Sequence, residues 1–160
     1  MRNLDKKDCI ILGILQNNCR TSLTEIAKQV NLSIDSVTKR IKKMEENKIF
    51  HPRIQIRPRN FGFANIVDIN IKLSDHSKEE RDKFINYLQE NSRIAEIFSI
   101  SGQWDLSIVL VSKDAADLEE ITSEIKEKFG KIINSWSESM TLTVYKFETY
   151  DMNKLMGFDN

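Results

Sequence analysis

Cysteine, proline, glycine and histidine are all scarce in this 160-residue sequence, which has 2 Cys, 2 Pro, 5 Gly and 2 His. Cys9 and Cys19 cannot build a disulfide framework, and they do not cluster with His51 or His76 at the spacing of a zinc site. The scattered glycines form no phosphate-binding loop. The sequence therefore predicts neither a metal site nor a cofactor, and enzymatic chemistry has little support.

Long hydrophobic runs are absent as well, because no apolar stretch approaches the roughly 18 residues that a membrane-spanning helix needs. The N-terminal sequence MRNLDKKD is charged and precedes no apolar block of the kind found in export signals. We therefore expect a cytoplasmic protein without a membrane partner. A chain of this length holds one ordinary domain or two small ones, and two fit better here.

The sequence has no net charge, but its two parts are oppositely charged. It contains 24 basic and 24 acidic residues in total. Residues 1–60 contain 13 Lys or Arg and 6 Asp or Glu, which gives a net charge of +7, whereas residues 61–160 have a net charge of −7. This asymmetry predicts an N-terminal nucleic-acid-binding part joined to a part with another task.

The segment 23–44 contains two helical hydrophobic patterns joined by a very short turn. Ser22 precedes the first pattern and Glu25 is spaced to complete a capping box with it. Asn31 occupies the turn, where asparagine tolerates a left-handed backbone, and Ser33 is a good N-cap for the second helix. With a further helix before them, these elements predict a helix-turn-helix whose second helix enters the major groove of DNA.

The exposed side of the second helix is rich in hydroxyl groups and cations, a composition that suits a groove lined by phosphates. We expect side chains near its N-terminal half to face base edges and those further along to hold phosphates. The alternative is that this charge run is only a solvated helix face. The predicted DNA-binding residues are Ser22 and Ser33, the base-edge candidates Asp35, Ser36, Thr38 and Lys39, and the phosphate candidates Arg40, Lys42 and Lys43.

Four parts are predicted along the chain: a helix-turn-helix domain over 1–50, a connector strand or wing over 51–64, a sheet domain over 65–150 and a tail over 151–160. In the second part Ile54 and Ile56 alternate with Arg53 and Arg57, which is typical of a strand. A wing would contact phosphate through one of these arginines, whereas a connector would only join the domains. The sequence does not decide between the two.

From residue 65 onward the pattern predicts the order β-α-β-β-α-β of a ferredoxin-like sheet with two helices on one side. Strands are expected at VDINIKL, IAEIFSI, WDLSIVLV and 133–147, and helices at 78–91 and from Asp114 to Gly130. We place Trp104, Ile108 and Leu110 on one face of the third strand, which leaves Leu106, Val109 and Val111 for the other. Either this strand is buried on both sides or the open sheet face dimerises, and we favour the dimer.

The sequence resembles the Lrp/AsnC, or feast/famine, transcription regulators over nearly its whole length. The matching motifs are Leu4-Asp5, Glu25-Ile26-Ala27, Leu32-Ser33, Arg40-Ile41 and Met44-Glu45 in the N-terminal part, and Gly102-Gln103-Trp104-Asp105 at the family's Gly-x-x-Asp turn. The resemblance implies an α+β fold in which a winged helix-turn-helix precedes a ferredoxin-like βαββαβ regulatory domain. It also implies dimers that assemble further, up to octamers, and an amino acid or related metabolite bound between dimers near that turn.

By this resemblance the effector-binding residues are Ser101, Gly102, Trp104 and Asp105. The alternative is that Gly102 only supplies a positive φ angle and Asp105 only bonds nearby amides. The chain departs from the family at Lys48, where glycine usually follows the recognition helix, so we expect Asn47 to cap that helix instead. The loop 72–78 and the tail carry no recognisable signature.

The resulting hypothesis is a sequence-specific, homo-oligomeric regulator that binds double-stranded DNA and is modulated by an amino acid or a related metabolite. One alternative is a tetrapyrrole-binding enzyme on the same two-domain plan, as in the sirohaem decarboxylases that resemble this family. His76 is the only histidine of the sheet domain, and the absence of a basic cluster around a plausible pocket counts against that enzyme. The other alternative is an architectural DNA-binding protein whose sheet domain only assembles it.

Overall fold

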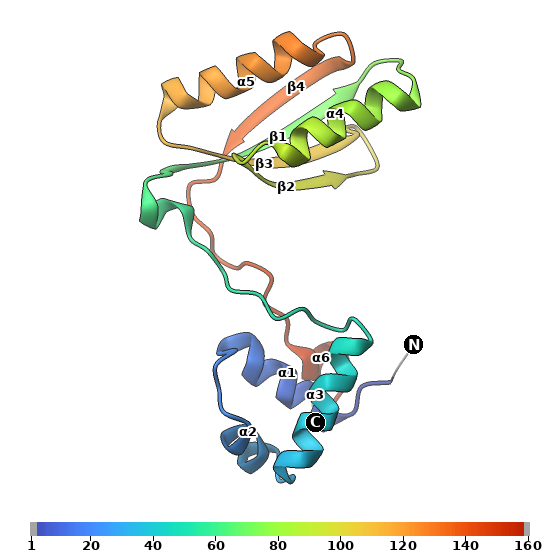
Figure 1. Cartoon of the computed structure of the whole chain (residues 1–160), viewed down its shortest axis with the longest axis vertical. Coiled ribbons are helices and arrows are strands. Elements are labelled where there is room, and N and C mark those ends of the chain that lie inside the picture. Colours follow the sequence, from blue (N-terminus) through green and yellow to red (C-terminus); the bar gives the residue numbers. More distant parts are fainter. Residues whose placement is uncertain (1–2, 159–160) are drawn as a thin grey trace. The chain divides into compact units, whose positions relative to one another are not determined.

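The computed structural model describes residues 3–158, which form two compact units built from different parts of the chain (Figure 1). The helical unit comprises the described residues up to Gln55 together with those from Tyr145 onward, and the sheet unit comprises Ile56–Val144. This division differs from the predicted one, which assigned residues 145–150 to the sheet domain and the rest to a separate tail. No helix within residues 3–158 is long and apolar enough to cross a membrane.

The helical unit contains the predicted helix-turn-helix. Its helices are α1 (Lys6–Asn17), α2 (Leu23–Val30), α3 (Ile34–Glu46) and the short α6 (Met152–Leu155). Ser22 and Ser33 are the N-caps of α2 and α3, and Asn31 between them has a left-handed backbone with φ 50°, as predicted. Ser22 accepts a hydrogen bond from the amide of Glu25 at 3.2 Å, but α2 lacks the second arm of a capping box, which within residues 3–158 is recorded for α1 and α4. The turn is therefore formed by the residues that the sequence indicated.

The core of the helical unit is closed by the C-terminal end of the chain. Ile11, Ile26 and Met44 are fully buried in this core, and Met152 and Phe158 pack against it. The side chain of Gln16 in α1 also holds the backbone of Tyr150, with one hydrogen bond donated and one accepted, each at 2.9 Å. Apolar burial and these paired bonds therefore make residues 150–158 part of the fold of the helical unit.

The C-terminal end of α3 is capped by Asn47, as expected from the lysine at position 48, where the family usually has glycine. Asn47 is the C-cap, and its side chain bonds the carbonyl of Lys43 at 2.5 Å. Lys48 follows with a left-handed backbone at φ 57°, and its amide bonds the carbonyl of Glu45 at 2.8 Å. A lysine here adopts a conformation that glycine would adopt without a steric cost.

The predicted strand or wing over residues 51–64 is not formed, so that part of the prediction was wrong. Residues 51–57 have no regular secondary structure, and the 3-10 helix η1 (Pro58–Phe61) follows them. Ile54 is 75% exposed. The alternation of apolar and polar residues was real, but a strand also needs a neighbouring strand, and the two prolines remove backbone donors. The segment is a connector.

The sheet unit has the predicted ferredoxin-like order, with all strand pairs antiparallel. The strands are β1 (Asn65–Leu73), β2 (Ile94–Ser99), β3 (Leu106–Ser112) and β4 (Ile133–Met140), and the helices are α4 (Lys78–Glu90) and α5 (Ala115–Phe129). They form one sheet in the order β2-β3-β1-β4, with both helices on the same side (Figure 1). Phe84, Leu88 and Ile125 from the helices meet the inward side chains of the strands in one core. This confirms the predicted α+β fold class.

Two details of the predicted strands were wrong. Leu106 faces the helices together with Ile108 and Leu110, and not the opposite side as expected, because side chains alternate strictly along β3. The last strand ends at Met140 instead of continuing to residue 147, and Leu142 beyond it is 78% exposed. Val109 and Val111 are half-buried on the face of the sheet that no helix covers.

Candidate functional site

The solvent side of α3 carries the predicted DNA-facing residues on a helix that the core holds in place. Val37 and Met44 anchor it from beneath and are fully buried. Lys39 pairs with Asp35 one turn earlier at 2.8 Å, and Lys42 pairs loosely with Glu46 at 3.9 Å. Exposed pairs of this kind contribute little to stability, so a phosphate can replace either carboxylate easily. Within residues 3–158 no ion pair is recorded for Lys43.

Three hydroxyl groups on the same helix already make local hydrogen bonds. Ser33 Oγ accepts the amide hydrogen of Ser36 at 3.1 Å, and the two hydroxyl oxygens lie 2.8 Å apart. Thr38 Oγ1 donates to the carbonyl of Ile34 at 2.8 Å. A hydroxyl that donates once can still accept a hydrogen bond, so these side chains keep some capacity toward a base edge.

Arg40 points toward α1 instead of lying free on the surface. Its Nη1 lies 2.7 Å from a carboxylate oxygen of Asp5 and 2.8 Å from one of Asp8, a side chain that is only 1% exposed. These hydrogen bonds raise the pKa of Arg40. Burial raises the pKa of Asp5, but the amide of Asp8 and the guanidinium of Arg40 outweigh it, so the net pKa is lowered. The prediction that Arg40 holds phosphate is therefore not supported, because its charge is used to join α3 to α1.

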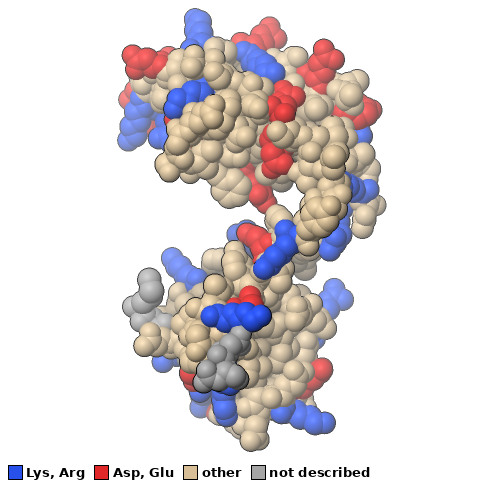
Figure 2. Space-filling view, turned by 180° about the vertical axis from the view of Figure 1, so that it is seen from behind, with Lys and Arg blue, Asp and Glu red and all other residues tan. Residues whose placement is uncertain are grey.

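The surface charge of the helical unit agrees with the prediction that this unit binds nucleic acid. In Figure 2 lysine and arginine side chains predominate on the visible surface of the helical unit, whereas the sheet unit shows both signs side by side. Residues 1–60 contain 13 basic and 6 acidic residues. A surplus of positive charge around an exposed recognition helix attracts the phosphate backbone before any base is read.

The Gly-x-x-Asp turn of the sheet unit joins β2 to β3 and is held by its own backbone. The amide of Ile100 donates to the carbonyl oxygen of Asp105 at 3.0 Å. The amide of Asp105 donates to the carbonyl oxygen of Ile71 on β1, also at 3.0 Å. Gly102 has φ +125°, a conformation that side chains with a Cβ rarely adopt. The turn therefore requires glycine for backbone reasons alone.

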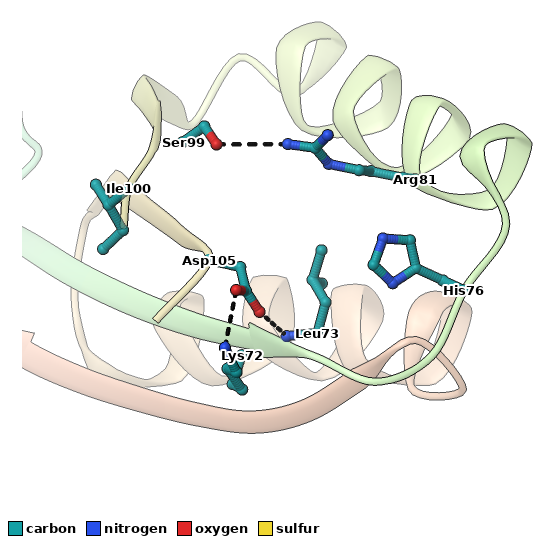
Figure 3. A pocket seen from close by; sticks show the side chains of 7 residues that line it. All are labelled: Lys72, Leu73, His76, Arg81, Ser99, Ile100 and Asp105. Carbon is teal, nitrogen blue, oxygen red and sulfur yellow. Dashed lines mark hydrogen bonds and ion pairs between the residues drawn. The ribbon is translucent and has the colours of Figure 1, made fainter. Parts of the chain in front are cut away.

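Asp105 links this turn to the end of β1. Its Oδ1 lies 2.9 Å from Nζ of Lys72, and its Oδ2 accepts the amide hydrogen of Leu73 at 2.8 Å (Figure 3). The hydrogen bond from Lys72 and then that from the Leu73 amide hold the pKa of Asp105 below its ordinary value. This carboxylate is therefore ionised and fixed in place at neutral pH.

A pocket of about 360 Å³ opens beside Asp105, within the size range of small-molecule sites. Figure 3 shows Arg81 and His76 on one side of it and Asp105 on the other. The pocket is lined by Lys72, Leu73, His76, Arg81, Ser99, Ile100 and Asp105. Of the four predicted effector residues only Asp105 is among them, because Ser101, Gly102 and Trp104 lie on the turn outside its wall.

The basic residues of this pocket were missed in the sequence. Lys72, near the end of β1, and His76 belong to the segment 72–78, which carries no recognisable signature, and Arg81 lies in the first turn of α4. One signal could have located it: Ser77 and Glu80 form a complete capping box, which fixes where α4 begins and places Arg81 beside the loop. The statement that no basic cluster surrounds a pocket was wrong. Among residues 3–158 no group of His, Cys, Asp and Glu could hold a metal ion.

Comparison with known proteins gives the same two units. Residues 4–45 match the AsnC-type helix-turn-helix domain and residues 67–135 match the Lrp/AsnC ligand binding domain. The HTH-type transcriptional regulator LrpA of Pyrococcus horikoshii is 33% identical over 130 residues, which are 81% of this chain and 88% of that protein. The regulator Ptr1 of Methanocaldococcus jannaschii is 29% identical over 91% of this chain and 95% of its own length.

Solved structures have the same fold. A transcriptional regulator from Neisseria meningitidis, solved as a complex with L-Met, superposes with a TM-score of 0.84 at 21% identity and covers 95% of this chain and 99% of its own. An AsnC family regulator from Agrobacterium tumefaciens has a TM-score of 0.81 at 26% identity over 92% of this chain and 95% of its own. The helix-turn-helix, the ligand-binding sheet and the identity to LrpA lead to one conclusion. The chain belongs to the Lrp/AsnC family of transcriptional regulators.

Proposed function

We propose that this regulator acts in the cytoplasm as a homo-oligomer, without catalysing a reaction, and that it reads double-stranded DNA in a sequence-specific way with α3. The observation that carries the proposal is the solvent face of that helix, where Lys39, Lys42 and Lys43 are exposed. Lys39 pairs only with the exposed Asp35 of the same helix, and Lys42 pairs only loosely with Glu46. Lys42 and Lys43 contact phosphates. Asp35, Ser36, Thr38 and Lys39 in the first half of the helix face base edges.

The remaining predicted residues have supporting parts in this proposal. Ser22 and Ser33 cap the helices that frame the turn, next to amide groups that favour phosphate oxygens. Arg40 positions α3 on α1 through Asp5 and Asp8 and does not itself bind DNA. Its loss would therefore tilt the reading helix without removing a phosphate contact.

The uncovered face of the sheet is the proposed dimer interface. Val109 and Val111 lie on it, and Phe98 on the neighbouring strand β2 is 49% exposed. A second copy of this face would bury these side chains with two-fold symmetry, and further assembly toward an octamer would build on such dimers. Two-fold symmetry predicts half-sites separated by about one helical turn of DNA, roughly 10 bp, or a multiple of it.

The pocket beside Asp105 is the proposed effector site, and an amino acid or a related metabolite is the proposed ligand class. Its volume of about 360 Å³ is at the small end for ligand sites, which favours an amino acid over a tetrapyrrole. Two similar proteins support this class, the Neisseria structure with L-Met and a relative in Zymomonas mobilis named as a glutamate uptake regulatory protein. Asp105 stays in the effector set, whereas Gly102 shapes the turn, and Ser101 and Trp104 are retained as flanking candidates only.

The test of DNA reading is fluorescence anisotropy with the DNA upstream of the protein's own gene and a shuffled control, at low and at near-physiological salt. We expect a preference for the upstream DNA that survives the higher salt. The Lys42→Ala and Lys43→Ala changes together should weaken binding to both DNAs and reduce the salt slope by roughly one unit per lost phosphate contact. Equal binding that disappears at higher salt would contradict sequence-specific reading.

A further inference from the structure

The charged side chains around the effector pocket do not balance. Lys72 and Arg81 each carry a permanent positive charge at neutral pH, Asp105 carries one negative charge, and His76 is the fourth ionisable residue of the wall. Lys72, Arg81 and Asp105 together therefore give the wall a net charge of +1. A neutral zwitterionic amino acid would leave this charge unmatched, whereas a ligand with a second carboxylate would match it.

Arg81 has most of its hydrogen-bonding capacity available to a ligand. The structure records one hydrogen bond for it among residues 3–158, a long one of 3.4 Å from Nη2 to Ser99 Oγ. A guanidinium has five N–H donors in a planar arrangement that fits a carboxylate with two parallel hydrogen bonds. In Figure 3 this side chain extends from α4 toward Ser99 at the end of β2.

His76 presents its second ring nitrogen for binding. Its Nδ1 lies 2.5 Å from the carbonyl oxygen of Ser74, and because a carbonyl only accepts hydrogen bonds, Nδ1 must carry the hydrogen. Nε2 is therefore the atom left for a ligand. On the opposite wall, Asp105 accepts hydrogen bonds from the ammonium group of Lys72 and from the amide of Leu73. Because a carboxylate has about four acceptor positions, Asp105 can also accept a hydrogen bond from the ammonium group of a ligand.

We propose that the effector of this regulator is a dicarboxylic amino acid, with its side-chain carboxylate on Arg81 and its ammonium group on Asp105. Lys72, whose ammonium has donors beyond the one given to Asp105, receives the α-carboxylate. The net charge of −1 on such a ligand equals the surplus of the pocket wall. This inference rests on the proposed function, namely that the pocket is an effector site, and adds the chemical class of the ligand.

The test is isothermal titration calorimetry of the full-length protein at pH 7 with L-glutamate and L-aspartate, and with L-glutamine and L-asparagine as uncharged analogues. Glutarate, which has two carboxylates without an ammonium group, tests the part assigned to Asp105, and L-methionine and L-leucine represent apolar effectors. We expect an acidic amino acid to bind roughly tenfold or more tightly than its amide and than glutarate, since each charge-assisted hydrogen bond adds about that factor.

The Arg81→Gln change removes the charge from the proposed carboxylate site and leaves a shorter, uncharged polar side chain. We expect it to weaken binding of the acidic amino acid roughly tenfold and to leave the affinity for its amide nearly unchanged. Arg81→Lys should restore part of the preference. Lys83→Gln is the matched control, because Lys83 is an exposed cation on the same helix that does not line the pocket.

The results also distinguish the proposal that the pocket is an effector site from the inference that its ligand is a dicarboxylic amino acid. Tighter binding of L-glutamine, L-methionine or L-leucine than of the acidic amino acids would overturn the dicarboxylate inference and leave the effector function intact. Absence of heat with every compound would overturn both. An equal loss of glutamate affinity in Arg81→Gln and Lys83→Gln would show that only the general charge of the surface matters.

Discussion

The core of the sheet unit comes from one continuous segment of the chain, whereas the core of the helical unit comes from two segments that are far apart in the sequence. The sheet unit uses one continuous stretch, Ile56–Val144, and every element of its core follows the one before it. The helical unit uses both ends, because Met152 and Phe158 pack against helices formed by the first 46 residues. A local sequence pattern therefore predicts a helix or strand well but does not predict a packing partner one hundred residues away.

Deleting residues 149–160 is the strongest test of this difference. We expect the helical unit to lose about 3 kcal/mol or more of unfolding free energy, since the packing of Met152 and Phe158 disappears together with the Gln16 bonds. Trp104 and Trp136, the only tryptophans, both lie in the sheet unit. Urea unfolding followed by tryptophan fluorescence should therefore keep its midpoint, while circular dichroism at 222 nm gains an earlier transition.

Single substitutions in the same segment provide the control. Phe158→Ala should reproduce part of the loss, whereas Leu155→Ala, at a residue of α6 that is 66% exposed, should have little effect. One coincident transition for the truncated protein, with an unchanged midpoint by both probes, would show that the tail does not stabilise the helices.

We expect the second largest effect from Arg40→Met. This variant tests whether Arg40 holds α3 on α1 or contacts DNA phosphate. The variant leaves Asp8, which is 1% exposed, without its guanidinium partner, so we expect the helical unit to lose about 2 kcal/mol while the salt slope of DNA binding stays unchanged. Lys42→Met, at a side chain that is 76% exposed, should do the opposite and lower the slope by about one with no change in stability. A reduced slope in Arg40→Met would restore Arg40 to the phosphate contacts.

Arg40→Met should also change how the free energy of unfolding depends on pH below about pH 4. The folded pKa of Asp5 is lowered from its ordinary value of 3.8, so its contribution is fully present above that pH and is lost as the pH falls through the folded pKa. Without Arg40 the lowering is smaller, and part of the pH dependence below about pH 4 should disappear. Unfolding midpoints measured between pH 2.5 and 6 in both proteins check this expectation.

Lys48→Gly is expected to have the smallest effect and the opposite sign. Lysine at φ 57° has a steric cost of about 1–2 kcal/mol that glycine avoids, and the larger entropy that glycine loses on folding offsets part of it. We expect a gain of about 0.5–1 kcal/mol in the helical unit, or roughly 3–6 °C in its melting temperature. Glu45→Gly, inside α3, should instead lose about 1 kcal/mol. Equal losses in both variants would exclude strain at Lys48.

Features fixed by neighbouring residues could be predicted from the sequence. The caps Ser22, Ser33 and Asn47, the left-handed Asn31 and the order of the sheet unit depend on residues within a few positions, or on a period of hydrophobicity, and they are confirmed. The strand expected around Ile54 failed because pairing depends on a second strand. Arg40 was assigned to phosphate because nothing in its own helix shows the carboxylates of Asp5 and Asp8. The cations of the pocket beside Asp105 were missed for the same reason, because they come from separate segments of the chain.

The closing of the helical core by residues 150–158 has a consequence for synthesis of the protein. During synthesis α1, α2 and α3 leave the ribosome before the sheet unit, whereas residues 150–158, which complete the core of these helices, leave it after the sheet unit. Domains generally fold as units during synthesis, starting from the N-terminus. In this chain the sheet unit can finish folding before the core of the helical unit is complete.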